Sequence, residues 1–283
     1  MKRLLQILFW SILPAAFIGP GTVTTSASAG ARYGYALLWA LTFSTVATVV
    51  LQEASARVTV VSGRNLAQAI RTRWHGQAVG FLVLLLLVGA IIVGNAAYEA
   101  GNVLGATAGA ELGAGLAPRT AAVLIGLFAF AVLWIGTPKS VAKVLAATVA
   151  VMGIAFLVTA VLLAPPVGEV LRGSVVPAFP AGSGLLVLGL IGTTVVPYNL
   201  FLGSGAAAGQ TLSEIRFGIA VAVVLGGLIS MGILVAIAVY ENSPPTPAPA
   251  TRIPIEINPP STTATAIPKR ISESVCPAAA PEP

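Results

Sequence analysis

The chain contains no aspartate, a single cysteine and a single histidine, and only 8% of its 283 residues are charged. The lone Cys276 excludes an internal disulfide and a cysteine metal cluster. All nine acidic residues are glutamates, and hard divalent cations are normally held by carboxylates, so the missing aspartates restrict how such an ion could be bound. No nucleophile and base pair, phosphate loop or cofactor fingerprint is visible. We therefore expect neither an enzyme nor a bound cofactor.

Apolar residues are abundant instead. They make up 57% of the chain, and the mean hydropathy is +0.94. Apolar runs of this length exceed what a soluble core needs and indicate an all-α integral membrane protein. The pI of 9.9 does not point to nucleic acid, because the Lys and Arg residues are scattered through loops instead of forming a stripe.

Counting roughly 20 apolar residues per bilayer crossing predicts about seven transmembrane helices. Their predicted ranges are 8–29, 35–61, 79–105, 120–137, 141–164, 184–208 and 216–240. With the N-terminus inside, nine basic residues fall on the cytoplasmic side and three outside, which supports this orientation. The inner set is Lys2, Arg3, Arg57, Arg64, Arg71, Arg73, Lys139, Lys143 and Arg216, and the outer set is Arg32, Arg119 and Arg172.

The N-terminus has an alternative interpretation. Met1-Lys2-Arg3, an apolar run and the small residues Ser26–Ala29 together imitate a cleavable signal peptide. We take the segment as retained, because its apolar stretch is nearly long enough to span a membrane and contains Pro20 where a signal sequence would be helical.

Two of the predicted spans contain helix breakers. These are Gly19-Pro20-Gly21-Thr22 in the first and Val196-Pro197-Tyr198-Asn199 in the sixth. Broken backbone at membrane depth is tolerated only where it is buried in protein or lines a polar cavity. Breaks at corresponding positions of two halves favour an inverted-repeat secondary transporter.

Two glutamates lie inside apolar segments, where ionisable groups are functional candidates by default. Glu53 is near the end of its span, so a structural role is at least as plausible as a functional one. Glu99 follows Asn95 and Tyr98 in a polar patch and carries more weight. Gly89, Gly94, Gly101 and Gly105 would let this third span pack closely on its neighbours.

The composition changes after Tyr240. Residues 241–283 are rich in Pro, Thr, Ala and Ser, so we expect a disordered tail following a transmembrane domain at 1–240. The tail is either a flexible appendage or the product of a frame change or truncation. We favour the second, because five spans plus two make an incomplete inverted repeat.

Several motifs in order resemble one family. Gly19-Pro20-Gly21-Thr22, residues 29–39 and Leu51-Gln52-Glu53-Ala54-Ser55-Ala56-Arg57 resemble the first two helices of the Nramp divalent-metal transporters, and residues 195–202 resemble their sixth. The resemblance covers about the first 240 residues. It implies a LeuT-type fold of two inverted repeats, here incomplete, and proton-coupled uptake of manganese or iron.

The resemblance weakens at the metal ligands. The family's first motif is Asp-Pro-Gly-Asn, so Gly19 and Thr22 replace two ligands. Its sixth-helix motif is Met-Pro-His-Asn, so Val196 and Tyr198 replace the thioether and the histidine while Asn199 matches. Loss of a carboxylate leaves a dehydrated dication without a counter-charge, and loss of the Met removes the preference for softer metals.

By the resemblance, the substrate site comprises the two breaks, with a coupling path on the third span. The predicted substrate or metal positions are Ala16, Gly19, Thr22, Thr193, Val196, Tyr198 and Asn199, where Ala16 and Thr193 act through backbone carbonyls. The coupling candidates are Asn95, Tyr98 and Glu99. In a competing interpretation, Thr hydroxyls bond back to their own helix, and Tyr or Asn merely satisfies backbone groups freed by a proline.

Three hypotheses follow. The first is a metal-ion carrier of the Nramp type with an altered site, taking a small inorganic cation in a bacterial inner membrane. The second is a LeuT-fold carrier of a non-metal solute. The third is an inactive truncated membrane protein. Membrane lipid is an expected partner, nucleic acid is not, and no oligomeric state is predicted.

Overall fold

The computed structural model describes residues 18–136 and 138–242, without the side chains of residues 78 and 138–146. All described residues belong to one unit of the chain, Met1–Thr246. Within the described ranges the regular structure is helical, with no strand. The elements are α2 (Pro20–Tyr33), the 3-10 turn η1 (Gly34–Leu37), α3 (Leu38–Ser62), α4 (Leu66–Trp74), α5 (Ala78–Ala114), α6 (Pro118–Ile135), α7 (Pro138–Leu162), α8 (Val167–Val175), α9 (Gly184–Thr194), α10 (Pro197–Ala206) and α11 (Leu212–Asn242).

The ends of these helices follow local sequence signals. Pro20, Pro118 and Pro197 each occupy the first turn of a helix, where the missing N–H costs no hydrogen bond. α3 and α5 end at Gly63 and Gly115, whose φ values of 67° and 64° place them in the left-handed region that glycine adopts without strain. The interiors are apolar, so the helices form where the predicted spans lie.

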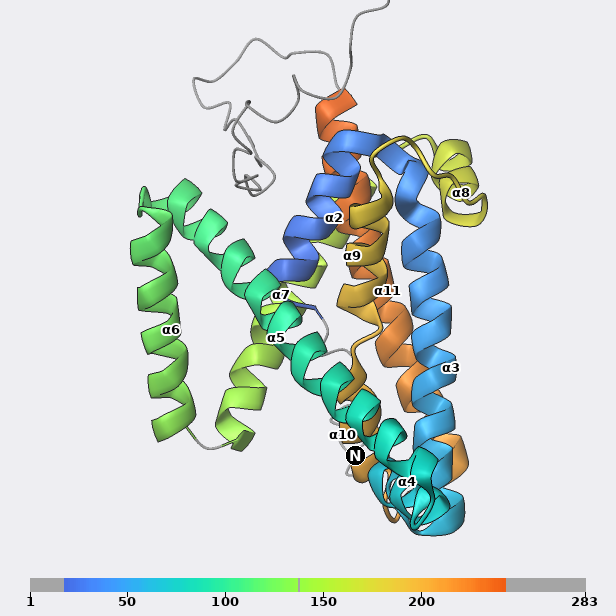
Figure 1. Ribbon diagram of the computed structural model, residues 1–283. Helices are drawn as coiled ribbons and strands as arrows, with labels where there is room; N and C mark the ends of the chain where they lie inside the picture. Colours follow the sequence, from blue (N-terminus) through green and yellow to red (C-terminus); the bar gives the residue numbers. More distant parts are fainter. Residues whose placement is uncertain (1–17, 137, 243–283) are drawn as a thin grey trace, which may run out of the picture. The chain divides into compact units, whose positions relative to one another are not determined.

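The core lies where α11 packs along α2 and α3, with α9 against the same group (Figure 1). Leu38, Leu41, Leu190 and Leu234 are fully buried there. α2 and α11 approach very closely, since a Cβ added at Gly30 would lie 2.3 Å from the carbonyl oxygen of Leu234. Close approach through small residues is the usual way that membrane helices associate, because lipid supplies no hydrophobic drive between them.

α5 is the longest helix and crosses the bundle diagonally (Figure 1). Its most apolar stretch, within Val79–Ala114, has no buried residue, and α6 is nearly as exposed. Among the described residues, five helical segments are long and apolar enough to cross a membrane, with α2 and α3 taken together as Pro20–Ser62 and the apolar part of α7, Ala147–Leu162, somewhat shorter. These features are those of an integral membrane protein.

The predicted spans are found with changed limits. The sixth is interrupted as expected, because α9 ends at Thr194 and α10 begins at Pro197. The third is longer than predicted, since α5 continues from residue 105 to Ala114 and takes in Glu111, which we had not placed in an apolar segment. For the first span, the described residues begin at Ile18, and α2 starts at Pro20 as the Gly-Pro motif predicts; the part of the predicted span at 8–17 lies outside the described residues.

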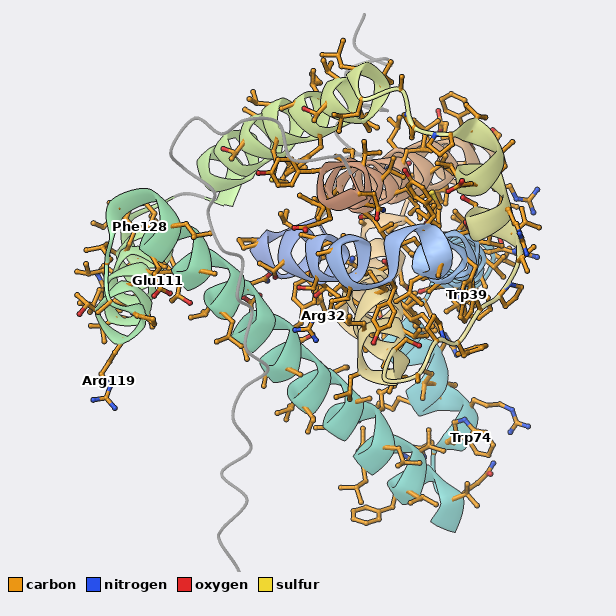
Figure 2. The ribbon with its side chains drawn as sticks, turned by 90° about the horizontal axis from the view of Figure 1, so that it is seen from above. Arg32, Trp39, Trp74, Glu111, Arg119 and Phe128 are labelled. Carbon is orange, nitrogen blue, oxygen red and sulfur yellow. The ribbon has the colours of Figure 1, made fainter. Side chains whose placement is uncertain are left out.

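Two short helices were not predicted. α4 occupies the basic segment expected to be a loop, and α8 follows the fifth span. α4 begins with a capping box between Asn65 and Gln68, a signal that the sequence carried. The segment after α8 is held by the Trp39 indole, which donates to the Ala178 carbonyl at 2.9 Å, on the side of the bundle where Trp39 is labelled in Figure 2.

Candidate substrate site at two helix breaks

The first break lies at Gly19, whose backbone is extended (φ −145°, ψ −179°) just before α2. Gly19 has no side chain to cap the free N–H groups of the first turn. Asn102 of α5 caps them instead, because its Oδ1 accepts from the Gly21 N–H at 3.2 Å. Thr22, one residue further on, is fully buried. The break is thus held by a side chain 81 residues away in the chain.

Asn102 fills the space that a side chain at Gly19 would need. A Cβ added at Gly19 would lie 2.7 Å from the Asn102 Oδ1, much closer than such atoms approach. The absence of a carboxylate at position 19 and the presence of this amide therefore belong together. A neutral carbonyl oxygen stands beside the position from which an aspartate side chain would project.

The second break separates α9 from α10 at Val195 and Val196, where Val195 leaves the helical region (φ −88°, ψ 78°) and Val196 is extended (φ −97°, ψ 124°). Hydroxyl groups of α3 satisfy carbonyls on both sides of it. Thr48 donates to the Thr194 carbonyl at 3.3 Å, and Ser55 donates to the Leu200 carbonyl at 2.6 Å. These bonds explain how irregular backbone is tolerated inside the bundle.

Asn199 is the most unusual residue of the second break. Its side chain is buried, with 4% of its surface exposed, and neither its amide nitrogen nor its amide oxygen has a hydrogen-bond partner. Buried amides are nearly always paired, since leaving one unpaired costs about 1–3 kcal/mol. Such a group is available to a solute or water, as a substrate ligand must be.

α5 joins the two breaks through one of its faces. A Cβ added at Gly105 would lie 2.5 Å from the Pro20 carbonyl oxygen, and one added at Gly94 would lie 3.5 Å from Cγ of Pro197. Eleven residues of helix separate these glycines, or about 16 Å. Tyr98 lies between them on the same face, about one turn from Gly94 and about two turns from Gly105.

Tyr98 brings the three elements together. Its ring meets that of Tyr198 edge to face, with centroids 6.1 Å apart and an interplanar angle of 68°. Its hydroxyl also lies close enough to the side chains of Thr22 and Asn102 to interact with both. The first break, α5 and the second break therefore converge on a cluster of neutral oxygen donors.

The predicted residues do not all enter this cluster. The structure groups Gly19, Thr22, Tyr98, Tyr198 and Glu99 around Asn102, directly or through one contact. Val196 is buried at the second break and offers no donor. The Thr193 hydroxyl donates to the Leu190 carbonyl of its own helix at 3.1 Å, as the competing interpretation expected. Ala16 lies outside the described residues.

The two remaining coupling candidates differ in environment. Glu99 is exposed on α5 and accepts from the Asn102 amide nitrogen at 3.4 Å, which links it to the first break. Asn95 has a buried Oδ1 without a partner. Glu53, by contrast, is paired with both Arg57 and Arg216, the latter at 2.8 Å from Nε, so it ties α3 to α11 as a structural residue.

Sequence reasoning missed Asn102. The signal was present, because Asn102 lies four residues after Tyr98 and three after Glu99, so the helical period places all three on neighbouring positions of one face. Asn102 was missed because the sequence alone does not distinguish it from a polar residue that hydrogen-bonds to the backbone of its own helix.

The arrangement supplies neutral oxygens and a single nearby carboxylate. In the described part of the chain, no group of three or more His, Cys, Asp or Glu side chains comes together. Such a donor set suits a cation that keeps part of its water shell, since small hard dications dehydrate reluctantly.

Residues 11–246 match the model of the family described as Nramp, natural resistance-associated macrophage protein-like. The chain is 31% identical over 258 residues to the divalent metal cation transporter MntH of Deinococcus radiodurans, covering 86% of this chain and 58% of that protein. It is 28% identical to MntH of Erwinia tasmaniensis, covering 80% of this chain and 56% of the relative. The chain thus spans somewhat over half the length of these relatives.

Solved structures share the fold. The manganese transporter of Eremococcus coleocola in complex with an aromatic bis-isothiourea substituted compound superposes with a TM-score of 0.60 at 21% identity, covering 80% of this chain and 50% of that one. A point mutant of the same transporter gives the same TM-score at 22% identity. This similarity confirms the predicted LeuT-type helical architecture over the part that is present.

Proposed function

The chain belongs to the Nramp family, and on that premise we propose that it carries metal ions across a membrane, by a site between its two broken helices. Its curated relatives are named as divalent metal cation transporters, which also supports the expectation that it is not an enzyme. The observation that carries the proposal is that both breaks meet at the side chains of Tyr98 and Asn102 of α5 and Tyr198 of α10.

The substrate we propose is a partly hydrated divalent cation. Thr22, Tyr98, Tyr198, Asn102 and Asn199 would present hydroxyl and carbonyl oxygens to it or to its water shell. Val196 supplies no sulfur, so the site has no means of favouring a soft transition metal over magnesium or calcium. Glu99 would supply the negative charge that Gly19 cannot, because its carboxylate reaches the first break through Asn102.

We further propose proton coupling through Glu99, with Asn95 and Tyr98 beside it on α5. Glu99 is a carboxylate of this helix that contacts the cluster, because it accepts a hydrogen bond from Asn102. Carboxylates inside membrane domains are typical members of proton relays. The second glutamate of α5, Glu111, lies nine residues further along the helix and has no part in the proposed path.

The distribution of basic residues supports a cytoplasmic N-terminus, and the bacterial relatives support the inner membrane. We assign metal-ion transport to residues 1–240 and treat residues 241–283 as a separate tail. Membrane lipid surrounds the exposed apolar faces of α5 and α6 in this proposal.

The test is uptake of manganese, magnesium and calcium into proteoliposomes by the full chain. We expect saturable uptake by the native chain and roughly tenfold slower uptake by Glu99→Gln, because one carboxylate charge within several ångströms of a dication is worth at least that factor. Glu111→Gln removes the same charge from the same helix and should leave uptake unchanged.

Two outcomes would count against the proposal. Uptake by the native chain no greater than by empty liposomes would reject carriage of these ions by this chain. An equal loss of uptake in Glu99→Gln and Glu111→Gln would reject a specific role for Glu99. It would not reject metal-ion transport by the chain.

A further inference from the structure

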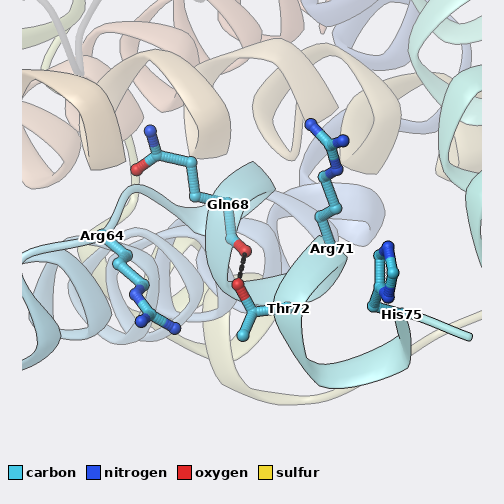
Figure 3. Close-up of a pocket in the computed structure, with 5 residues that line it drawn as sticks. All are labelled: Arg64, Gln68, Arg71, Thr72 and His75. Atoms are coloured by element: carbon cyan, nitrogen blue, oxygen red, sulfur yellow. Dashed lines mark hydrogen bonds between the residues drawn. The ribbon is translucent and has the colours of Figure 1, made fainter.

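A second site lies outside the helix breaks, on α4. An open pocket of about 780 Å³ is lined by Arg64, Gln68, Arg71, Thr72 and His75. These positions follow the helical spacing of one face, so every lining side chain comes from one side of α4 or from its immediate ends. Figure 3 shows the five side chains projecting from this segment, with the Thr72 hydroxyl bonded to the Gln68 carbonyl at 2.9 Å.

The pocket is cationic and its charges are uncompensated. Both arginines are exposed, and no carboxylate of the described residues pairs with Arg64 or Arg71. The nearest ion-pair network, around Glu53, is saturated by Arg57 and Arg216. The lining has hydrogen-bond donors but no acidic group, which is the chemistry of an anion site.

α4 is held firmly in place. The Leu66 N–H at its start donates to Ser204 Oγ of α10 at 2.7 Å, and the same oxygen is bonded to Thr59 of α3 at 2.7 Å. The opposite face of α4, with Leu66, Ile70 and Trp74, is half-buried. The basic face is therefore presented in a fixed orientation, which lowers the entropy lost on binding.

The location of α4 indicates which anion it meets. α4 connects the end of α3 to the beginning of α5, two helices long and apolar enough to span a membrane, so it lies at a bilayer surface. Trp74 ends the helix, with the Arg73 guanidinium 5.1 Å from its ring centre. Tryptophan and arginine at a helix end are typical of the headgroup layer, and basic pockets there bind anionic headgroups.

We propose that the basic face of α4 is a binding site for a phosphate group, provided by the headgroup of an anionic phospholipid. The guanidinium groups of Arg64 and Arg71 would hold the phosphate oxygens, with Gln68, Thr72 and His75 around them. The site is independent of the substrate site proposed above. It would fix the α3–α4–α5 corner to the membrane surface.

The experiment measures the thermal unfolding midpoint of the purified full chain in neutral detergent. Phosphatidylglycerol, phosphatidylcholine and inorganic phosphate are titrated separately, because a ligand that binds the folded state raises the midpoint by mass action. We expect saturable stabilisation by phosphatidylglycerol. Arg64→Gln/Arg71→Gln should bind it about 30-fold more weakly, since each basic side chain at an anionic surface contributes a factor of about 5.

Matched variants separate this site from general charge attraction. Arg119→Gln/Arg172→Gln also removes two exposed arginines, and Figure 2 shows Arg119 projecting away from the bundle. Its affinity should equal that of the native chain. Arg64→Lys/Arg71→Lys keeps the charge without the two-pronged geometry, and we expect intermediate affinity and native helix content by circular dichroism.

The separate titrations also distinguish a lipid headgroup from free phosphate as the ligand. Stabilisation by phosphatidylglycerol alone, lost in Arg64→Gln/Arg71→Gln, supports the lipid headgroup. Stabilisation by inorganic phosphate alone would overturn the lipid assignment in favour of a free ion. Equal effects of phosphatidylcholine and phosphatidylglycerol, or equal loss in the two Gln double variants, would overturn the site itself.

Discussion

At the scale of single residues, Gly19 and Asn102 act as a pair. Glycine at position 19 leaves room for the Asn102 amide, and the amide in turn caps α2 through the Gly21 N–H. A substitution at either position should disturb the same hydrogen bond. The family motif has an aspartate at position 19. Here the neutral amide oxygen of Asn102, from another helix, lies beside that position.

A double-mutant cycle tests this coupling. Gly19→Ala should force Asn102 to rotate away and lose the Gly21 bond, and Asn102→Ala should lose it directly, each lowering the free energy of unfolding by about 1 kcal/mol. Because both remove one bond, the double variant should be less destabilised than the sum. The measurement is equilibrium unfolding in detergent, and strictly additive losses would show that the residues do not act together.

At the scale of helices, the position of α5 depends on contacts between backbones. Gly105 approaches the Pro20 carbonyl so closely that an added Cβ would lie 2.5 Å from it, whereas an added Cβ at Gly109 meets nothing within 4 Å. Both glycines lie in the same helix. They form a matched pair for testing how α5 is fixed against the first break.

Gly105→Ala should lower the free energy of unfolding by about 1–3 kcal/mol, because a backbone carbonyl cannot rotate aside. Gly109→Ala should leave it unchanged or raise it by up to about 1 kcal/mol through helix propensity. Thermal unfolding of the purified variants in one detergent gives the comparison. Equal midpoints for the two would contradict the close approach of α5 to Pro20.

At the scale of the whole molecule, orientation in the membrane decides which end of the site opens to which side. The excess of basic residues at the end of α3 and around α4 predicts that this end is cytoplasmic. Arg172 of α8 should then be outside, with the segment anchored by Trp39.

Cysteine labelling in intact cells checks the orientation. In a Cys276→Ser background, His75→Cys should resist a membrane-impermeant maleimide until the cells are opened, while Arg172→Cys should react at once. Both positions are exposed, so accessibility within the protein does not differ. The reverse pattern of labelling would invert the predicted topology.

The sequence predicted some levels of this structure better than others. Membrane class, the helical fold and the second break at Val196-Pro197 were read correctly, because hydropathy and proline act locally. The short helices α4 and α8 were missed, since their apolar faces are too brief for a span count. The end of α5 was misplaced because small residues and Glu111 interrupt its hydropathy without interrupting its helix.

The candidate site shows the same division. The sequence by itself determined the family, the two breaks and the loss of charge at Gly19, since each depends on residue identity along one segment. Only the tertiary structure decided that Asn102 occupies the space beside Gly19, that the Thr193 hydroxyl turns back to its own helix, and that Asn199 is buried without a partner. The physical reason is that hydrogen bonding and burial at membrane depth depend on which helices meet, and α5 reaches both breaks from a part of the chain distant from either.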